Sequence, residues 1–122
     1  MYGMKYTKVC TLSDLPDDEG LKVVEGDTAV AVFNVNGKVL ATQDRCSHAK
    51  WSLSEGGYLD GDVIVCSLHM GKFCAHTGAV KMAPPWKPLK KYPVKVEGED
   101  VFVAFEDGYF EAEQSKSKVM DG

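Results

Sequence analysis

The 122-residue sequence lacks any apolar run approaching the roughly 18 residues of a membrane span, so it predicts no transmembrane helix. Its first residues, 1–5, lack the basic-then-apolar layout of a secretory signal. Both absences favour a cytoplasmic protein. In that compartment cysteines stay reduced, and clusters of cysteine and histidine indicate metal sites rather than disulfides.

Several functional motifs are also missing. The chain has no GxGxxG for a dinucleotide, no flavin motif and no mononuclear iron site of two histidines and a carboxylate. It is too short to carry a catalytic oxygenase domain as well. The formal net charge of −4, without a basic stripe, excludes a general nucleic-acid binder. We therefore expect a protein that is not an enzyme by itself.

Helix signals are weak, because no segment combines a sustained 3.6-residue periodicity with caps. What the sequence does contain is a series of short β-rich runs separated by turn residues. The strongest is residues 28–42, in which Asn36-Gly37 predicts a type I′ hairpin turn. Further strands are expected within 6–10, 21–24, 62–66 and 92–105, the last forming two strands around a turn at 97–100.

This pattern predicts an all-β fold, a small antiparallel sandwich or barrel. We expect a single domain over residues 1–110. Residues 45–88 are rich in Gly, His, Cys, Pro and Trp, and we interpret them as a loop-built subdomain inserted between strands of the β-body. The polar segment 111–122 is expected to be a flexible tail.

Two of the four cysteines and two of the three histidines form paired motifs, Cys46-x-His48 and Cys66-x-x-His69. These short offsets let both side chains of a pair reach one point from a tight turn. Two such turns make a site of two thiolates and two imidazoles. That donor set suits either a closed tetrahedral zinc site or a [2Fe–2S] cluster with two histidines on one iron.

The order of the ligands bears on this choice. Zinc fingers usually pair cysteine with cysteine and later histidine with histidine, whereas here each arm offers one of each. A binuclear cluster uses that order directly, with both thiolates on one iron and both imidazoles on the other. A zinc-stabilised Cys₂His₂ β-domain acting as an interaction module stays open as the alternative.

The sequence resembles the Rieske-type [2Fe–2S] proteins, and most closely the small ferredoxins of bacterial aromatic-ring-hydroxylating dioxygenases of the biphenyl and naphthalene kind. Beyond the four ligands, the resemblance extends from about residue 5 to residue 105. It differs where many relatives have Pro after a cysteine and this chain has Ser47 and Ser67. The positions beyond the ligands that carry the resemblance are Leu53, Gly56, Gly61, Phe73, Gly78 and the loop Ala83–Pro85.

This resemblance implies that Cys46 and Cys66 bind the buried iron, and that His48 and His69 bind the outer iron near the surface. It implies a one-electron carrier between a flavin-containing, NADH-dependent ferredoxin reductase and a terminal Rieske oxygenase, in aromatic hydrocarbon catabolism. A monomer is expected, because a shuttle must dock to two partners in turn. The other interpretation of the same cluster is that the protein is a small Rieske subunit of a different oxidoreductase.

Charge counting predicts the direction of the reduction potential. With neutral histidines, an oxidised cluster of this type has no net charge, whereas an all-cysteine cluster carries two negative charges, so histidine ligation raises the potential. High-potential Rieske proteins add a disulfide and hydroxyl donors at positions that are here Trp51, Leu68, Gly71 and Phe73. We therefore expect a potential towards the low end of roughly −150 to +300 mV.

The remaining cysteines and histidine have simpler interpretations. Cys10, on an expected strand, is interpreted as a core residue, Cys74 as a small half-buried thiol, and His76 as a loop residue without a redox role. A small basic and apolar rim for partner docking is expected around the histidines. Its candidate residues are Lys50, Trp51, Met70, Pro84, Pro85 and Trp86.

Overall fold

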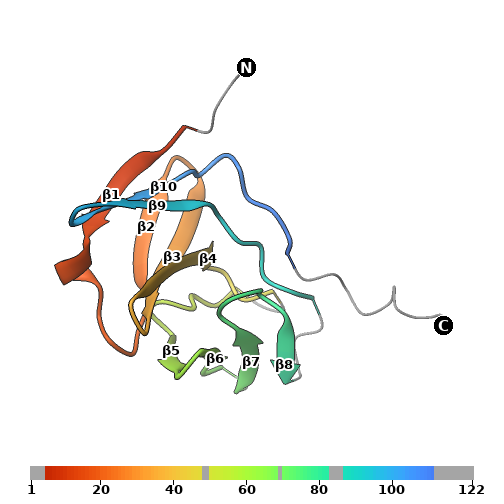
Figure 1. The fold of residues 1–122 in the computed structure, drawn as a ribbon. Coiled ribbons are helices and arrows are strands. Elements are labelled where there is room, and N and C mark those ends of the chain that lie inside the picture. The colour runs from red at the N-terminus through yellow and green to blue at the C-terminus, as the bar shows by residue number, and fades with distance from the viewer. Residues whose placement is uncertain (1–4, 48–49, 69, 83–86, 112–122) are drawn as a thin grey trace.

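The computed structural model describes residues 5–47, 50–68, 70–82 and 87–111, and Figure 1 shows their arrangement. Within this part, no helix is long and apolar enough to cross a membrane. The elements in chain order are β1 (Thr7–Thr11), the 3₁₀ turn η1 (Leu12–Asp14), β2 (Leu21–Glu25), β3 (Thr28–Val35), β4 (Lys38–Gln43), β5 (Gly57–Asp60), β6 (Val63–Cys66), β7 (Gly71–Cys74), β8 (Val80–Met82), β9 (Val94–Glu97) and β10 (Asp100–Val103).

The strands form three antiparallel sheets, in the orders β1-β10-β9, β2-β3-β4 and β5-β6-β7-β8. This architecture confirms the predicted all-β fold. The predicted hairpin is also confirmed: β3 pairs with β4 from Val30↔Gln43 to Val35↔Lys38. Asn36 and Gly37 both have positive φ, 52° and 91°, as a type I′ turn requires.

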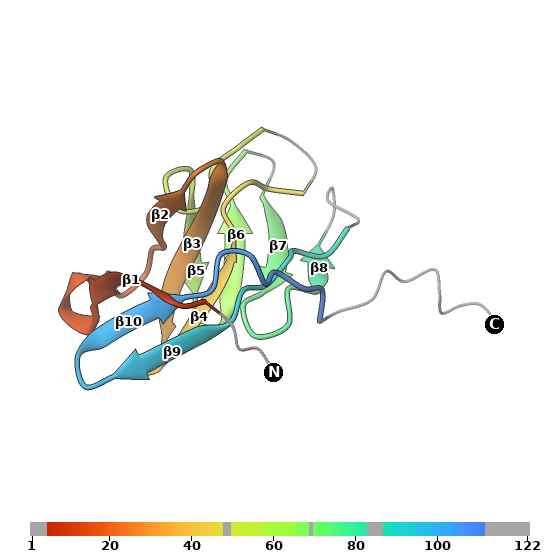
Figure 2. The ribbon, with the colours of Figure 1, turned by 90° about the horizontal axis from the view of Figure 1, so that it is seen from above.

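The strand β3 lies between two hydrophobic cores, because successive side chains of a strand point to opposite faces. Val30 and Val32 pack in one core with Val101 and Val103 of β10. Phe33 belongs to the other core, together with residues of the β5–β8 sheet. Figure 2 shows this arrangement, with β2, β3 and β4 between the β1-β10-β9 sheet and the β5–β8 sheet.

The segment 45–88 is more regular than its sequence indicates. We expected mainly loops with one strand at 62–66, and the structure shows four paired strands. The three unexpected strands have only three or four residues each, so alternation is too brief to detect. Their register comes instead from pairing with β6, as in Leu59↔Ile64 and Ile64↔Phe73.

The last described residues are held against the body by Lys91, whose side chain is largely buried. Its backbone N–H and C=O both pair with Tyr109, at 2.7 and 2.8 Å. Its Nζ donates to the backbone oxygen of His76 and lies 3.0 Å from the Glu111 carboxylate. The single-domain boundary at 110 therefore falls one residue before this contact. Of the predicted flexible tail, 111–122, all but the first residue lies outside the described residues.

Gly78 and Gly61 give a test of how the β7–β8 turn is packed. Both have positive φ, 81° and 65°, but a Cβ at Gly78 would lie 2.5 Å from the backbone oxygen of Leu89, whereas one at Gly61 meets nothing within 4 Å. We expect Gly78→Ala to lower the free energy of unfolding by about 3 kcal/mol and Gly61→Ala by about 1 kcal/mol, because only the first adds overlap to backbone strain. Equal losses in denaturant titrations of the two variants would contradict this packing.

Candidate metal centre

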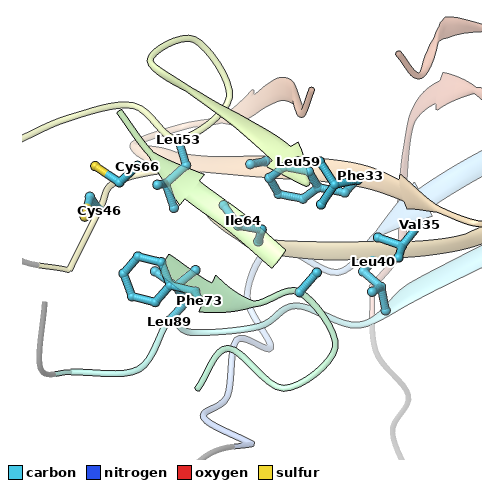
Figure 3. Packing of buried hydrophobic residues seen from close by; sticks show 12 residues of the cluster. Phe33, Val35, Leu40, Cys46, Leu53, Leu59, Ile64, Cys66, Phe73 and Leu89 are labelled. Carbon is cyan, nitrogen blue, oxygen red and sulfur yellow. The ribbon is translucent and has the colours of Figure 1, made fainter. Parts of the chain in front are cut away.

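Two cysteines from separate segments meet at one end of a buried core. Cys46 follows β4 and lies next to the isolated bridge between Arg45 and Ser52, while Cys66 is the last residue of β6. Neither forms a disulfide, their relative exposures are 1% and 0%, and both belong to the same hydrophobic cluster. Figure 3 shows their side chains at the same end of that cluster.

The surroundings of the two thiols are apolar. Leu53, Phe73 and Leu89 are fully buried members of the same cluster and lie at the cysteine end of the view in Figure 3. A thiolate in such surroundings is costly unless a cation compensates its charge. Metal binding supplies that compensation, because a coordinating thiol is deprotonated. The donor set of two buried thiols therefore fits an iron ion with thiolate ligands.

The serines that follow the cysteines use their hydroxyl groups on backbone oxygens. Ser47 Oγ donates to the Lys87 oxygen at 2.8 Å, and Ser67 Oγ donates to the Gly56 oxygen. The indole N–H of Trp51 also donates to the Gly56 oxygen, at 2.6 Å. A hydroxyl has one proton to donate. These groups therefore tie the loops together in place of hydrogen bonds to sulfur.

Several predicted site residues lie outside the part of the chain that the structure describes: His48, His69, Pro84, Pro85 and Trp86. The residues that the structure does describe contain no group of three or more His, Cys, Asp and Glu able to hold a metal. The four-ligand set thus stays a prediction.

The predicted docking residues that the structure describes lie in the same part of the chain. Lys50 and Met70 are exposed, Met70 by 46%, and Trp51 is half-buried against the core. Met70 adopts a positive φ of 59°, which is uncommon for a residue with a side chain. Such conformations occur at functional sites, where the surrounding structure maintains them.

The other two cysteines and His76 lie elsewhere. Cys10 is buried in the second core, as predicted, and burial raises the pKa of its thiol. Cys74 is half-buried on β7; its burial opposes ionisation, but hydrogen bonds with Thr77 outweigh it and lower the pKa of Cys74. His76 Nε2 lies 3.7 Å from the Asp62 carboxylate. Both Cys74 and His76 are thus engaged with neighbouring turn residues.

Comparison with known proteins decides between a zinc site and a [2Fe–2S] cluster. Residues 5–93 match the family model of the Rieske [2Fe-2S] domain. The chain belongs to the Rieske family. It carries a Rieske-type [2Fe–2S] cluster, and the zinc-stabilised interaction module is not favoured. The two buried thiols described above are consistent with this cofactor.

Two Rieske relatives are similar over nearly their whole length. The biphenyl dioxygenase ferredoxin subunit of Pseudomonas sp. (strain KKS102) is 58% identical over 102 residues, which is 84% of this chain and 94% of that protein. The ferredoxin component of biphenyl 2,3-dioxygenase from Rhodococcus jostii (strain RHA1) is 50% identical over 105 residues, covering 86% and 97%.

Solved structures agree with these relatives. A chain from the complex of reduced oxygenase and oxidised ferredoxin in carbazole 1,9a-dioxygenase superposes with a TM-score of 0.78 and 38% identity, covering 91% of this chain and 100% of that one. The ferredoxin of Sphingomonas yanoikuyae B1 gives 0.76 and 36%, covering 82% and 98%. This Rieske protein is accordingly an electron-transfer component rather than a catalytic enzyme, as expected.

Sequence reasoning missed the residues that organise the loop around Cys46. Asp44 is buried and bonds to Ser52 and Ser54, which the sequence placed simply within a loop-built region. No local signal marks this contact, because Ser52 and Ser54 lie 8 and 10 residues further along the chain. Met82 was not among the predicted docking residues. It is 50% exposed, and it pairs with Lys72, which lies two residues after Met70 in the chain.

Proposed function

We propose that this Rieske protein accepts single electrons from a flavin-containing, NADH-dependent ferredoxin reductase and delivers them to a terminal ring-hydroxylating Rieske oxygenase. The observation that carries the proposal is the 58% identity to a biphenyl dioxygenase ferredoxin subunit over 94% of that protein. The superposition on a chain from a carbazole dioxygenase complex supports an oxygenase as one partner. A cytoplasmic monomer suits this role, because it can dock to two partners in turn.

The proposed ligands are Cys46 and Cys66 on the inner iron and His48 and His69 on the outer iron. The near-zero exposure of both thiols supports their inner position. When bound, the cluster supplies a one-electron couple whose two histidines raise its potential above that of an all-cysteine cluster. Leu53, Phe73 and Leu89 exclude water on the cysteine side, so exchange with a partner is expected at the opposite, histidine side.

The proposed docking surface consists of Lys50, Trp51, Met70, Pro84, Pro85 and Trp86. Support comes from the described members: Met70 and Lys50 are exposed and flank the segments that bear the ligands. Transient redox complexes use small interfaces, so a few apolar contacts contribute much of the affinity. The half-exposed Met70 fits such a contact, because methionine adapts to different surfaces.

Reconstitution tests the carrier role. Purified protein is combined with candidate reductase and oxygenase components, and NADH consumption and ring hydroxylation are measured. We expect both rates to depend on this protein and to saturate with its concentration. Unchanged hydroxylation when the protein is omitted, with every matched pair of components, would reject the proposal.

A charge placed at Met70 tests the docking surface. We expect Met70→Glu to raise the KM of the oxygenase for this protein by about tenfold, because a buried unpaired charge in the complex costs about 1.4 kcal/mol or more. Val96→Glu is the matched control, since Val96 is a similarly exposed apolar residue, 41%, on β9 in another sheet. Equal effects of both substitutions would remove Met70 from the docking surface.

A further inference from the structure

Asp44 is a buried carboxylate, 3% exposed, within the loop region of the metal centre. Its Oδ1 accepts hydrogen bonds from the backbone N–H of Ser54 at 2.9 Å and from Ser54 Oγ at 2.6 Å. Its Oδ2 accepts from Ser52 Oγ at 2.7 Å. Hydrogen bonds to an ionised acceptor are roughly twice as strong as neutral ones. In the described part of the chain, hydroxyl and amide dipoles rather than cations hold this charge.

These bonds close the loop that carries the first ligand pair. The Asp44 backbone oxygen accepts from Leu53 N at 2.6 Å, and Cys46 N donates to the Trp51 oxygen at 2.8 Å. The Asp44 backbone N–H donates to Ala29 at 3.1 Å, which anchors the loop to β3. Asp44 therefore joins both ends of the Cys46 loop to β3.

The same network continues to the second ligand loop. Gly56 N donates to the Ser52 oxygen at 2.7 Å, which places the Gly56 carbonyl beside the first loop. That carbonyl accepts from Trp51 Nε1 at 2.6 Å and from the backbone N–H of Ser67 at 3.1 Å. Ser67 directly follows Cys66. A continuous path of hydrogen bonds thus runs from the Asp44 carboxylate to the residue next to the second cysteine.

We propose that Asp44 is the positioning residue of this metal centre: its carboxylate holds the Cys46 loop in register with the Cys66 loop, and so controls cluster retention and the reduction potential. This proposal rests on the proposed ligand assignment of Cys46 and Cys66. A partly satisfied buried polar network is worse than none, so the loss of the carboxylate frees the serine hydroxyls and the loop together.

The charge of Asp44 adds an electrostatic effect. It lies two residues from Cys46 in an environment of low dielectric, where charges interact more strongly than in water. A fixed negative charge disfavours an added electron. An asparagine keeps the shape and one acceptor oxygen of Asp44 but removes its charge. This variant therefore isolates the effect of the charge on the potential from the effect of the hydrogen bonds on the loop.

Asp14 provides a matched control. Its carboxylate also accepts from a backbone N–H and a hydroxyl, those of Thr11 at 2.9 and 3.1 Å, but it belongs to the exposed turn η1, beside the β1-β10-β9 sheet. Asp14→Ala therefore removes a backbone and a hydroxyl hydrogen bond to a carboxylate at an exposed position, without touching the loops of the metal centre.

The experiment compares the holoprotein with three variants by the rate of iron release to a chelator, by voltammetry and by thermal unfolding. For Asp44→Ala we expect iron release to accelerate at least tenfold. For Asp44→Asn we expect iron release close to the parental rate and a potential shifted positive. For Asp14→Ala we expect a lower unfolding temperature with iron release and potential unchanged.

Parental iron release and potential in Asp44→Ala would overturn the proposal, because Asp44 would then be a structural residue like Asp14. If Asp44→Ala does not fold, Ser54→Ala decides, since it removes the shortest of the three bonds; iron release accelerated about threefold supports the proposal, and a parental rate overturns it. Cys46→Ala tests the ligand assignment separately from the positioning role of Asp44. Retention of the cluster in that variant refutes the ligand assignment.

Discussion

Alanine at Cys46 or at Cys66 is expected to yield a colourless protein with less than about a tenth of the iron and sulfide of the parent. Both thiols are buried in the same core, and they are the only cysteines among the described residues of that core. On the proposed ligand assignment, either substitution removes one of the two thiolates that would hold the inner iron, and cluster binding is coupled to folding. Iron and sulfide analysis, with the visible absorption spectrum, measures the result.

The other two cysteines of the chain serve as controls of the same residue type. Cys10→Ala removes a sulfur from the second core, and Cys74→Ala removes a half-buried thiol from β7. We expect both variants to retain the cluster, with a loss of stability of about 1 kcal/mol for Cys10→Ala. A colourless Cys74→Ala protein would make Cys74 a ligand, and a coloured Cys66→Ala protein would refute the assignment.

The reduction potential is expected near the low end of the Rieske range, about −150 mV. Phe73 and Leu68 offer no hydroxyl, Gly71 has no side chain, and the indole N–H of Trp51 donates to Gly56. The hydroxyls of Ser47 and Ser67 donate to backbone oxygens as well. Among the described side chains beside the two cysteines, few donors are therefore left to stabilise the charge of the reduced cluster. A clearly positive midpoint in a redox titration would contradict this.

Phe73→Tyr tests the cause of the low potential. The Phe73 ring lies at the cysteine end of the core in Figure 3, so a tyrosine there offers a donor to sulfur. We expect the potential to rise by roughly 60 mV, which is a tenfold change in a one-electron equilibrium. Phe33→Tyr is the control: Phe33 is equally buried in the same cluster but lies away from the cysteines. It should lose stability and keep the parental potential.

The sequence predicted the β-body well because its signals are local. The hairpin around Asn36-Gly37 depends on two residues that accept positive φ, and β9 and β10 flank a short turn that is equally easy to recognise. The family was also predictable, since the spacing of the Cys/His pairs and glycines is specific. These features need no knowledge of distant contacts.

The β5–β8 sheet could not be predicted in the same way. Its strands are short, and the pairing of Gly71 with Cys66 sets a register that local alternation does not reveal. The role of Asp44 was hidden for the same reason: the aspartate is ordinary in sequence, and only its burial and its bonds to Ser52 and Ser54 distinguish it. Long-range pairing and burial are properties of the folded chain.

The double burial of β3 limits how far the β5–β8 sheet can be transplanted. A designer who moved residues 45–88 to another scaffold would leave behind Ala31, Phe33 and Val35, which belong to the core shared with the two cysteines. The transplant would expose that side to water and remove the Ala29 anchor of the Cys46 loop. The smallest portable electron-transfer module is therefore expected to include the β3–β4 hairpin.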